Sequence, residues 1–242
     1  MEVNKKTRKR KDQVKSNIIV IIPAYNEEAS IAKVIADIPK GLAEEVIVVN
    51  NNSTDRTAEM AQAAGATVLN QRQQGYGAAC LKGIAYAREK KMPPEIVVFI
   101  DGDYSDFPQQ MPDVLAPIIE QDIDMVIGSR ALGQRQKGAM MPQQIFGNWL
   151  ATRLIRLFYG MRFTDLGPFR AIKFHKLLAI GMKDEDYGWT VEMQLKAAKY
   201  KLKVTEVPVD YKKRIGVSKV SGTIKGTFMA GYKILWTIFR YL

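Results

Sequence analysis

Two acidic residues stand one position apart directly after a run of apolar residues. Residues 96–100 are apolar and mostly β-branched, as in a strand buried on both faces, and the run ends in Asp101, Gly102 and Asp103. Open α/β sheets bind ligands beyond the carboxyl ends of their strands, and neighbouring carboxylates repel unless a cation lies between them. Such oxygen ligands suit Mg²⁺ or Mn²⁺ bridging a pyrophosphate. The pattern therefore favours a metal site at Asp101 and Asp103; the alternative is an acid-rich turn.

Residues that follow two earlier apolar runs could bind a nucleotide or its phosphates. Tyr25 offers an aromatic face and Glu27 a hydrogen-bond acceptor, although Glu27 could equally favour the dipole of the following helix. Asn50 begins a run of three asparagines, which is unusual for a helix cap alone. Gly75 and Gly77 belong to a turn that opens a helical pattern, so backbone amides there could approach a phosphate or a sugar.

Apolar runs of strand length alternate with segments of helical period along most of the chain. The predicted strands are 18–22, 45–49, 67–69, 96–100, 125–127 and 203–211. The predicted helices are 30–38, 54–64, 76–90, 109–121, 142–161 and 221–242. Such alternation implies right-handed crossovers between parallel strands. We therefore predict one α/β domain with a mainly parallel, Rossmann-like central sheet and helices on both faces.

Charge and cysteine content limit the classes of function. The net charge is +11, with +5 in residues 1–15, +9 in residues 196–242 and −3 between them. Basic ends indicate an anionic partner such as phosphate, nucleic acid or an anionic membrane surface. The single cysteine, Cys80, excludes an internal disulfide and favours a reducing cytosol. The single histidine, His175, argues against a zinc hydrolase or a Ser-His-Asp enzyme.

The two ends of the chain are predicted to differ from the central domain. Residues 1–16 form a basic tail that we expect to be disordered, and no stretch approaches the roughly 18–20 apolar residues that span a bilayer. Residues 221–242 are predicted to form an amphipathic helix, which could lie on a membrane surface or pack on its own core or on a second subunit. Its apolar side holds Ile224, Phe228, Leu235, Phe239 and Leu242, widened by Ile234 and Ile238, and its basic side holds Lys225, Lys233 and Arg240.

Eight short motifs resemble those of family 2 glycosyltransferases and occur in the same order. The resemblance spans roughly residues 17–225 and is greatest to the branch of polyprenyl-phosphate hexosyltransferases that contains dolichyl-phosphate mannose synthase. The motifs are PAYNEE at 23–28, VVNNNSTD at 48–55, GYGAA at 75–79, DGD at 101–103, GSR at 128–130, TDLGPFR at 164–170, YGWTVE at 187–192 and RIGVSK at 214–219.

The resemblance implies a GT-A fold over residues 17–220 and a nucleotide-diphosphate hexose as donor. Pro23, Tyr25 and Glu27 match the loop that contacts the nucleotide. Asn50 stands where the family usually has an aspartate that binds the base, and an amide both donates and accepts, so the base preference stays open. From the resemblance we expect a donor of the UDP-glucose or GDP-mannose type.

The resemblance also implies a divalent metal, Mg²⁺ or Mn²⁺, as cofactor. Asp101 and Asp103 match the metal motif of the family. Ser105 falls where the mannose synthases use a glutamine as a further ligand. Because a serine hydroxyl is shorter, Asp106 or water would complete the shell.

Further positions match residues at the phosphate and sugar ends of the family's site. Arg130 matches the arginine that faces an acceptor phosphate, and Arg214, Ser218 and Lys219 match a late loop that binds the donor diphosphate. Asp165 and Glu192 match acids that line the sugar and acceptor end. A phosphate acceptor is already anionic and needs no base, whereas a hydroxyl acceptor would make Asp165 the first choice of base.

These patterns lead to one main hypothesis and two kinds of alternative. The main hypothesis is an inverting, metal-dependent hexosyltransferase that acts on a polyprenyl phosphate, cytoplasmic and peripheral to the inner face of the cell membrane. One alternative keeps the enzyme class with a soluble or non-prenyl lipid hydroxyl acceptor. Alternatives of another class are a basic nucleic-acid-binding protein, which we do not favour, and a non-catalytic protein that binds sugar nucleotides. Homo-oligomers are compatible with each hypothesis.

Overall fold

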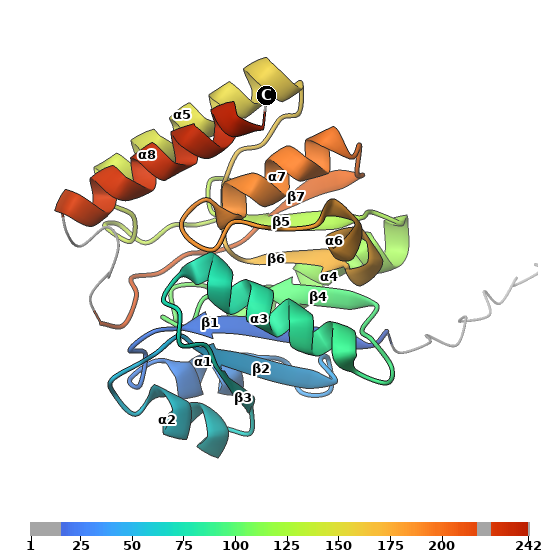
Figure 1. Cartoon of the computed structure of the whole chain (residues 1–242), viewed down its shortest axis with the longest axis vertical. Helices are drawn as coiled ribbons and strands as arrows, with labels where there is room; N and C mark the ends of the chain where they lie inside the picture. The colour runs from blue at the N-terminus through green and yellow to red at the C-terminus, as the bar shows by residue number, and fades with distance from the viewer. Residues whose placement is uncertain (1–15, 217–223, 242) are drawn as a thin grey trace, which may run out of the picture.

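The computed structural model describes residues 16–216 and 224–241, and its centre is a seven-stranded sheet (Figure 1). The strand order is β3-β2-β1-β4-β6-β5-β7. Among these strands only β6 runs antiparallel to its neighbours, so the other six end at one common edge, the carboxyl edge of the sheet. The strands are β1 (Ile18–Ala24), β2 (Glu45–Asn50), β3 (Thr67–Asn70), β4 (Ile96–Phe99), β5 (Met125–Ser129), β6 (Arg170–Lys173) and β7 (Val204–Pro208).

The direction of β6 brings a distant part of the chain to the carboxyl edge. Arg170, its first residue, pairs with Phe99 near the end of β4 and with Ile127 in β5. The segment that leads into β6, including Asp165, therefore lies beside the ends of parallel strands. Neither β6 nor the two helices after it, α6 (Phe174–Ile180) and α7 (Trp189–Lys199), were predicted from the sequence.

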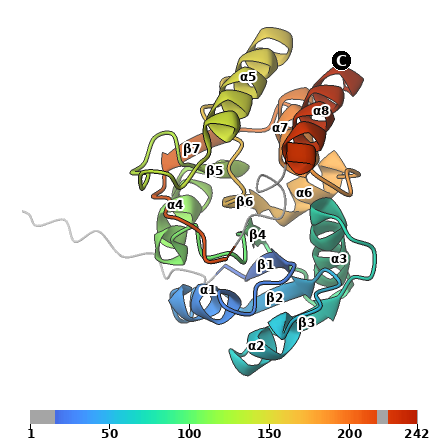
Figure 2. The same cartoon turned by 90° about the vertical axis from the view of Figure 1, so that its left-hand side faces the viewer.

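Helices cover both faces of the sheet, as predicted (Figures 1 and 2). One face packs against α3 (Tyr76–Glu89), α6 and α7. The other face packs against α1 (Ile31–Asp37), α2 (Thr57–Ala63) and α4 (Met111–Gln121), which follows a single 3-10 turn at Pro108–Gln110. Two further helices, α5 (Pro142–Tyr159) and α8 (Ile224–Arg240), lie side by side outside α7.

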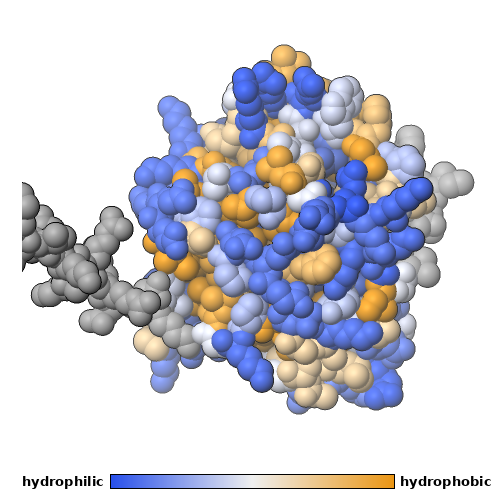
Figure 3. Space-filling view, turned by 180° about the vertical axis from the view of Figure 1, so that it is seen from behind, coloured by the Kyte–Doolittle hydropathy of each residue, from blue (hydrophilic) through white to orange (hydrophobic). Residues whose placement is uncertain are grey.

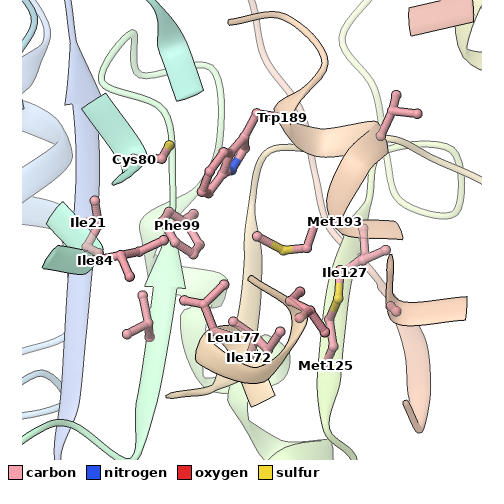
Figure 4. Close-up of a cluster of buried hydrophobic side chains, with 14 of the residues drawn as sticks. Ile21, Cys80, Ile84, Phe99, Met125, Ile127, Ile172, Leu177, Trp189 and Met193 are labelled. Atoms are coloured by element: carbon pink, nitrogen blue, oxygen red, sulfur yellow. The ribbon is translucent and has the colours of Figure 1, made fainter. Parts of the chain in front are cut away.

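The central strands consist of consecutive apolar residues because helices cover both faces of the sheet, so successive side chains are buried on opposite faces. Ile19 and Ile21 of β1 point into the core beneath α3, whereas Val20 points into the opposite core. In the first core the ring of Phe99 meets the edge of Trp189 at a centroid distance of 5.8 Å (Figure 4). The surface seen from behind is mostly hydrophilic, with hydrophobic residues interspersed (Figure 3).

The last helix packs on the protein along one edge of its predicted apolar side, the edge formed by Ile234 and Ile238. Ile238 is fully buried and Ile234 packs against the core beside it, but Phe239, on the predicted apolar side, is 52% exposed. Tyr159 of α5 fixes this arrangement by donating to the carbonyl of Ile238 at 2.9 Å. Residues 1–15 and the side chains of Ile224, Lys225, Phe228 and Leu242 lie outside the described part of the chain.

Two adjacent leucines of α6 test the assignment of the core. Leu177→Ala should lower the free energy of unfolding by about 2–5 kcal/mol, because Leu177 is buried under the sheet and its truncation leaves a cavity. Leu178→Ala is the matched control, since Leu178 is 39% exposed and should cost well under half as much. Urea unfolding of both variants measures the difference. Equal losses would contradict the orientation of α6.

Candidate functional site

A cavity of about 510 Å³ opens at the carboxyl edge of the sheet. The ends of β1 and β4, the glycine-rich turn before α3 and the loop before α7 form its walls. The structure thus brings together residues that are up to 191 positions apart in the sequence, from Pro23 to Arg214. Seven of the predicted site residues line the cavity: Pro23, Tyr25, Glu27, Gly75, Asp101, Asp103 and Arg214.

Asp101 and Asp103 are crowded into the floor of this cavity. Burial, followed by the charge of Asp103, raises the pKa of Asp101 to about 7. Tyr76 donates to Oδ1 of Asp101 at 3.0 Å, and the backbone amide of Ser105 donates to Oδ1 of Asp103 at 2.9 Å. Crowded carboxylates of this kind are a suitable binding site for a divalent cation that also takes oxygens from a bound diphosphate.

The residues next to this acid pair do not form a larger metal cage. In the described part of the chain no three His, Cys, Asp or Glu residues are placed to hold one ion. Ser105 uses its hydroxyl as a donor to Asp103. Asp106 is buried, and neither of its carboxylate oxygens has a hydrogen-bond partner. Burial raises the pKa of Asp106 well above its ordinary value, and the charges of Asp101 and Asp103 add to this effect.

Arg214 supplies positive charge beside the acid pair. One guanidinium nitrogen, Nη2, lies 2.9 Å from Oδ2 of Asp103 and 3.3 Å from Oε1 of Glu27. Its loop is held against the acidic segment by a hydrogen bond from the backbone amide of Ile215 to the carbonyl of Asp103, at 3.0 Å. Ser218 and Lys219, predicted to follow in the same loop, lie outside the described residues.

Arg130 and Asp165 form a buried ion pair at the same edge of the sheet, outside the cavity wall. Nε and Nη2 of Arg130 donate to the two carboxylate oxygens of Asp165, each at 2.8 Å, and the guanidinium lies 5.0 Å from the ring centroid of Tyr211. Burial alone would raise the pKa of Asp165, but its contacts with Arg130 outweigh burial and lower it. Asp165 is therefore an ionised partner that orients Arg130.

Glu192 lies on α7 and its carboxylate is directed at the loop before that helix. It accepts hydrogen bonds from the backbone amides of Lys183 and Asp184, at 3.0 and 2.7 Å. It also pairs with Lys196 at 2.7 Å and accepts from the hydroxyl of Tyr241 at 2.5 Å. Glu192 is fully buried and does not line the cavity, so its contacts support the loop.

The second asparagine of the run, rather than the first, lines the cavity. Asn50 donates to Oδ1 of Asn70 at 3.0 Å and accepts from the amide of Ser53 at 3.2 Å. Asn51 lines the cavity and accepts from the amide of Gly75 at 2.8 Å. Successive side chains along an extended segment point to opposite sides, and a run of three identical residues does not reveal which of them points into the site. For this reason Asn51 was not predicted.

Gly75 and Gly77 are required by a close approach of the loop before α7. A Cβ atom at Gly75 would lie 2.1 Å from the carbonyl oxygen of Glu185, and one at Gly77 would lie 2.0 Å from that of Asp184. Gly75 also has φ of +150°, which a residue with a side chain rarely adopts. The missing side chains thus let this loop pack on the start of α3.

Further residues that line the cavity were not predicted as site residues. Among them are Tyr76, Asp186 and Tyr187, whose side chains carry a hydroxyl or carboxylate. Tyr76 and Tyr187 belong to motifs that were recognised, but nothing in their spacing shows that the two segments meet. Asp186 lies one residue before the YGWTVE motif, and nothing in the sequence around it indicates a role in binding.

Comparisons with known proteins agree with this arrangement. The family model for glycosyl transferase family 2 matches residues 19–180. An uncharacterised glycosyltransferase of Mycobacterium tuberculosis is 33% identical over 217 residues, which cover 88% of this chain and 94% of the relative. Undecaprenyl-phosphate mannosyltransferase of Micrococcus luteus is 28% identical over 221 residues, with coverage of 86% and 89%.

Solved structures share the fold. Glucosyl-3-phosphoglycerate synthase from Mycobacterium tuberculosis, solved with Mn²⁺, UDP and phosphoglyceric acid, aligns with a TM-score of 0.74 at 23% identity, over 93% of this chain and 78% of that one. The predicted α/β fold of the GT-A type is thereby confirmed. The family match and the glycosyltransferase relatives confirm the prediction of an enzyme. The family match covers most of the sheet and its carboxyl edge, and the chain belongs to glycosyl transferase family 2.

Proposed function

We propose that this glycosyltransferase moves a hexose, with inversion, from a nucleoside-diphosphate sugar to a polyprenyl phosphate at the inner face of the cell membrane. The observation that carries the proposal is an exposed, acid-free surface of aromatic and basic residues on α5 and α8, described below. The name of the Micrococcus luteus mannosyltransferase supports a polyprenyl phosphate as acceptor. The structure of the synthase with Mn²⁺ and UDP supports a metal-bound donor.

The donor half of the proposal rests on the cavity. Tyr25 offers a ring to the base, and Asp101 and Asp103 would hold Mg²⁺ or Mn²⁺. The cation would neutralise the diphosphate and stabilise it as a leaving group. Arg214 is placed to exchange its contact with Asp103 for the negative charge that develops on the diphosphate.

The acceptor half rests on the ion pair of Arg130 and Asp165. A hydroxyl acceptor needs a base, but both carboxylate oxygens of Asp165 are occupied by Arg130 and the pKa of Asp165 is lowered. A phosphate acceptor is already anionic and needs a cationic group to orient it. Arg130, held by Asp165 and stacked on Tyr211, supplies that group.

The aromatic surface is formed by exposed side chains of α5 and α8, which lie side by side (Figure 1). Phe158 of α5 meets the edge of Phe239 of α8 at a centroid distance of 5.8 Å and joins the two helices. Leu157 is 73% exposed and Trp236 is 52% exposed, although soluble proteins rarely group such residues without a partner. We use the name aromatic surface for the exposed large apolar and aromatic side chains of the two helices, which are Ile145, Phe146, Trp149, Leu157, Phe158, Met229, Tyr232, Trp236 and Phe239.

The charge around the aromatic surface favours an anionic bilayer as its partner. Residues 137–164 contain four Lys or Arg and no acid, and residues 211–242 contain seven Lys or Arg and no acid. Aromatic and basic residues together are typical of helices that lie in the interface of an anionic membrane. A second copy of the chain would instead bring like charge against like charge. None of the described helices is long and apolar enough to cross a bilayer.

The acceptor assay tests the proposal directly. With labelled UDP-glucose or GDP-mannose and Mn²⁺, the enzyme should transfer the label to undecaprenyl or dolichyl phosphate in detergent. Transfer to phosphoglyceric acid should be at least tenfold slower, because a soluble acceptor makes no use of the aromatic surface. Label found only on the soluble phosphate, or on a lipid that carries a hydroxyl in place of phosphate, would refute the proposed acceptor.

Asp103→Asn tests the metal site. The variant should weaken Mn²⁺-dependent binding of the donor at least tenfold, about 1.4 kcal/mol, because it removes one of the two charges that hold the cation. Asp113→Asn is the control, since Asp113 is an exposed acid in the first turn of α4 and should leave binding unchanged. Isothermal titration with and without Mn²⁺ measures both. Metal-dependent binding that survives in Asp103→Asn would contradict the assignment.

The double variant Trp149→Ser, Trp236→Ser tests the aromatic surface. It should weaken binding to anionic vesicles at least tenfold, because each large apolar side chain contributes roughly 1.5–3 kcal/mol when buried. Tyr200→Ser is the control, as Tyr200 is equally exposed but lies at the end of α7. Cosedimentation with vesicles gives the affinities, and wild-type binding should fall as salt rises. A wild-type protein that stays in the supernatant at low salt would exclude this membrane surface.

A further inference from the structure

The loop before α7 is part of the cavity wall but is held in place from outside the cavity. We call residues 182–188 the donor-site loop, because Asp186 and Tyr187 line the cavity. The loop lies between the start of α3 on one side and α8 on the other. The family model ends at residue 180, so the donor-site loop and α8 both follow the matched region.

On the side of α3 the contacts of the loop are close and mainly through the backbone. The amide of Ala78 donates to the carbonyl of Glu185 at 2.8 Å, and Gln73 donates to Oε2 of Glu185 at 2.6 Å. Gly75 and Gly77 leave no room for a side chain beneath the loop. A shift of the loop must therefore alter the wall of the cavity.

On the side of α8, the described residues form an ion pair with the loop. Nζ of Lys233 lies 3.2 Å from Oδ2 of Asp184, whose side chain is 8% exposed. The other oxygen of Asp184 accepts from the amides of Asp186 and Gly188, at 2.8 and 3.1 Å. Lys233 therefore pairs with the carboxylate of Asp184, which also accepts the hydrogen bond that fixes the backbone at Asp186.

A second connection runs from the end of α8 through α7. The hydroxyl of Tyr241 donates to Glu192, and Glu192 accepts from the amides of Lys183 and Asp184. Helix α8 therefore reaches the beginning of the donor-site loop through Tyr241 and its middle through Lys233. The same helix carries Trp236 and Tyr232 of the aromatic surface on its exposed side.

We propose that α8 couples membrane docking to donor binding, with Lys233 and Tyr241 as positioning residues that hold the donor-site loop. This inference rests on the proposed membrane surface. A single helix of this length is marginally stable without packing, so burial of its exposed side in a bilayer stabilises α8 in its docked position. The docked helix in turn stabilises the loop conformation in which Asp186 and Tyr187 complete the cavity.

Coupling of this kind has a strict thermodynamic consequence. If vesicles raise the affinity for the donor by some factor, the donor must raise the affinity for vesicles by the same factor. Typical coupling free energies correspond to factors of roughly 5–150. We expect a factor of about ten, because the bilayer acts through one ion pair and one hydrogen bond.

The experiment measures donor dissociation constants with and without saturating anionic vesicles. The donor is UDP-glucose or GDP-mannose, whichever the wild-type protein binds with Mn²⁺. The coupling factor is the donor dissociation constant without vesicles divided by that with vesicles. Lys233→Met should bring this factor close to one, and Lys233→Arg should restore most of the coupling. Arg240→Met is the matched control, because it removes the same charge from α8 and, in the described structure, Arg240 forms no ion pair with the loop. It should weaken vesicle binding as Lys233→Met does, yet keep the coupling.

Tyr241→Phe keeps the packing of the ring and removes only the donor to Glu192, so it tests the second connection independently. It should lower the coupling without lowering the free energy of unfolding by more than about 1–2 kcal/mol. Vesicle binding that leaves wild-type donor affinity unchanged overturns the coupling while the proposed membrane surface stands. Equal coupling in Lys233→Met and Arg240→Met also overturns it. A wild-type protein that binds donor but not vesicles overturns both the coupling and the membrane surface.

Discussion

The structure depends above all on balancing buried carboxylates at the carboxyl edge of the sheet. Asp103, Asp106 and Asp165 are each almost fully buried there, and burial of a charge is costly unless a partner of opposite charge is present. Arg130 neutralises Asp165, and Arg214 neutralises Asp103. Burial raises the pKa of Asp101 and Asp106, and the charges of neighbouring carboxylates add to this effect. A divalent cation beside Asp101 and Asp103 would reduce the repulsion that remains.

The topology of the sheet is what brings these charges together. Parallel strands deliver Asp101 and Arg130 to one edge, but the partner of Arg130 comes from the segment before β6. That segment reaches the edge only because β6 runs antiparallel between β4 and β5. Arg170 then holds it by donating to the backbone carbonyls of Leu166 and Thr190, with its own side chain fully buried. One reversed strand thus makes the ion pair possible.

The sequence predicts the parts of this site that follow long apolar runs and misses those that depend on tertiary contacts. Asp101 and Asp103 were predicted because a buried strand ends beside them. Strand β6 was missed because only four residues form it, with Arg170 and Lys173 at its ends, and pairing with both neighbours makes it a strand. The orientation of Glu192 could not be predicted either, since it depends on a loop and on a helix far along the chain.

The position of α8 also depends on tertiary contacts that its sequence does not reveal. A helical projection centres the apolar side on Leu235 and Phe239, with Ile238 at its edge, but packing on α5 and α7 buries Ile238 and leaves Phe239 exposed. The aromatic residues that remain outside lie beside basic ones, and no acid follows Asp210 in the sequence. Helix α8 thus packs one side on the core, exposes another side that suits an anionic bilayer, and pairs Lys233 with the donor-site loop. These three sets of contacts explain its position. Its sequence alone specifies only that it has two different sides.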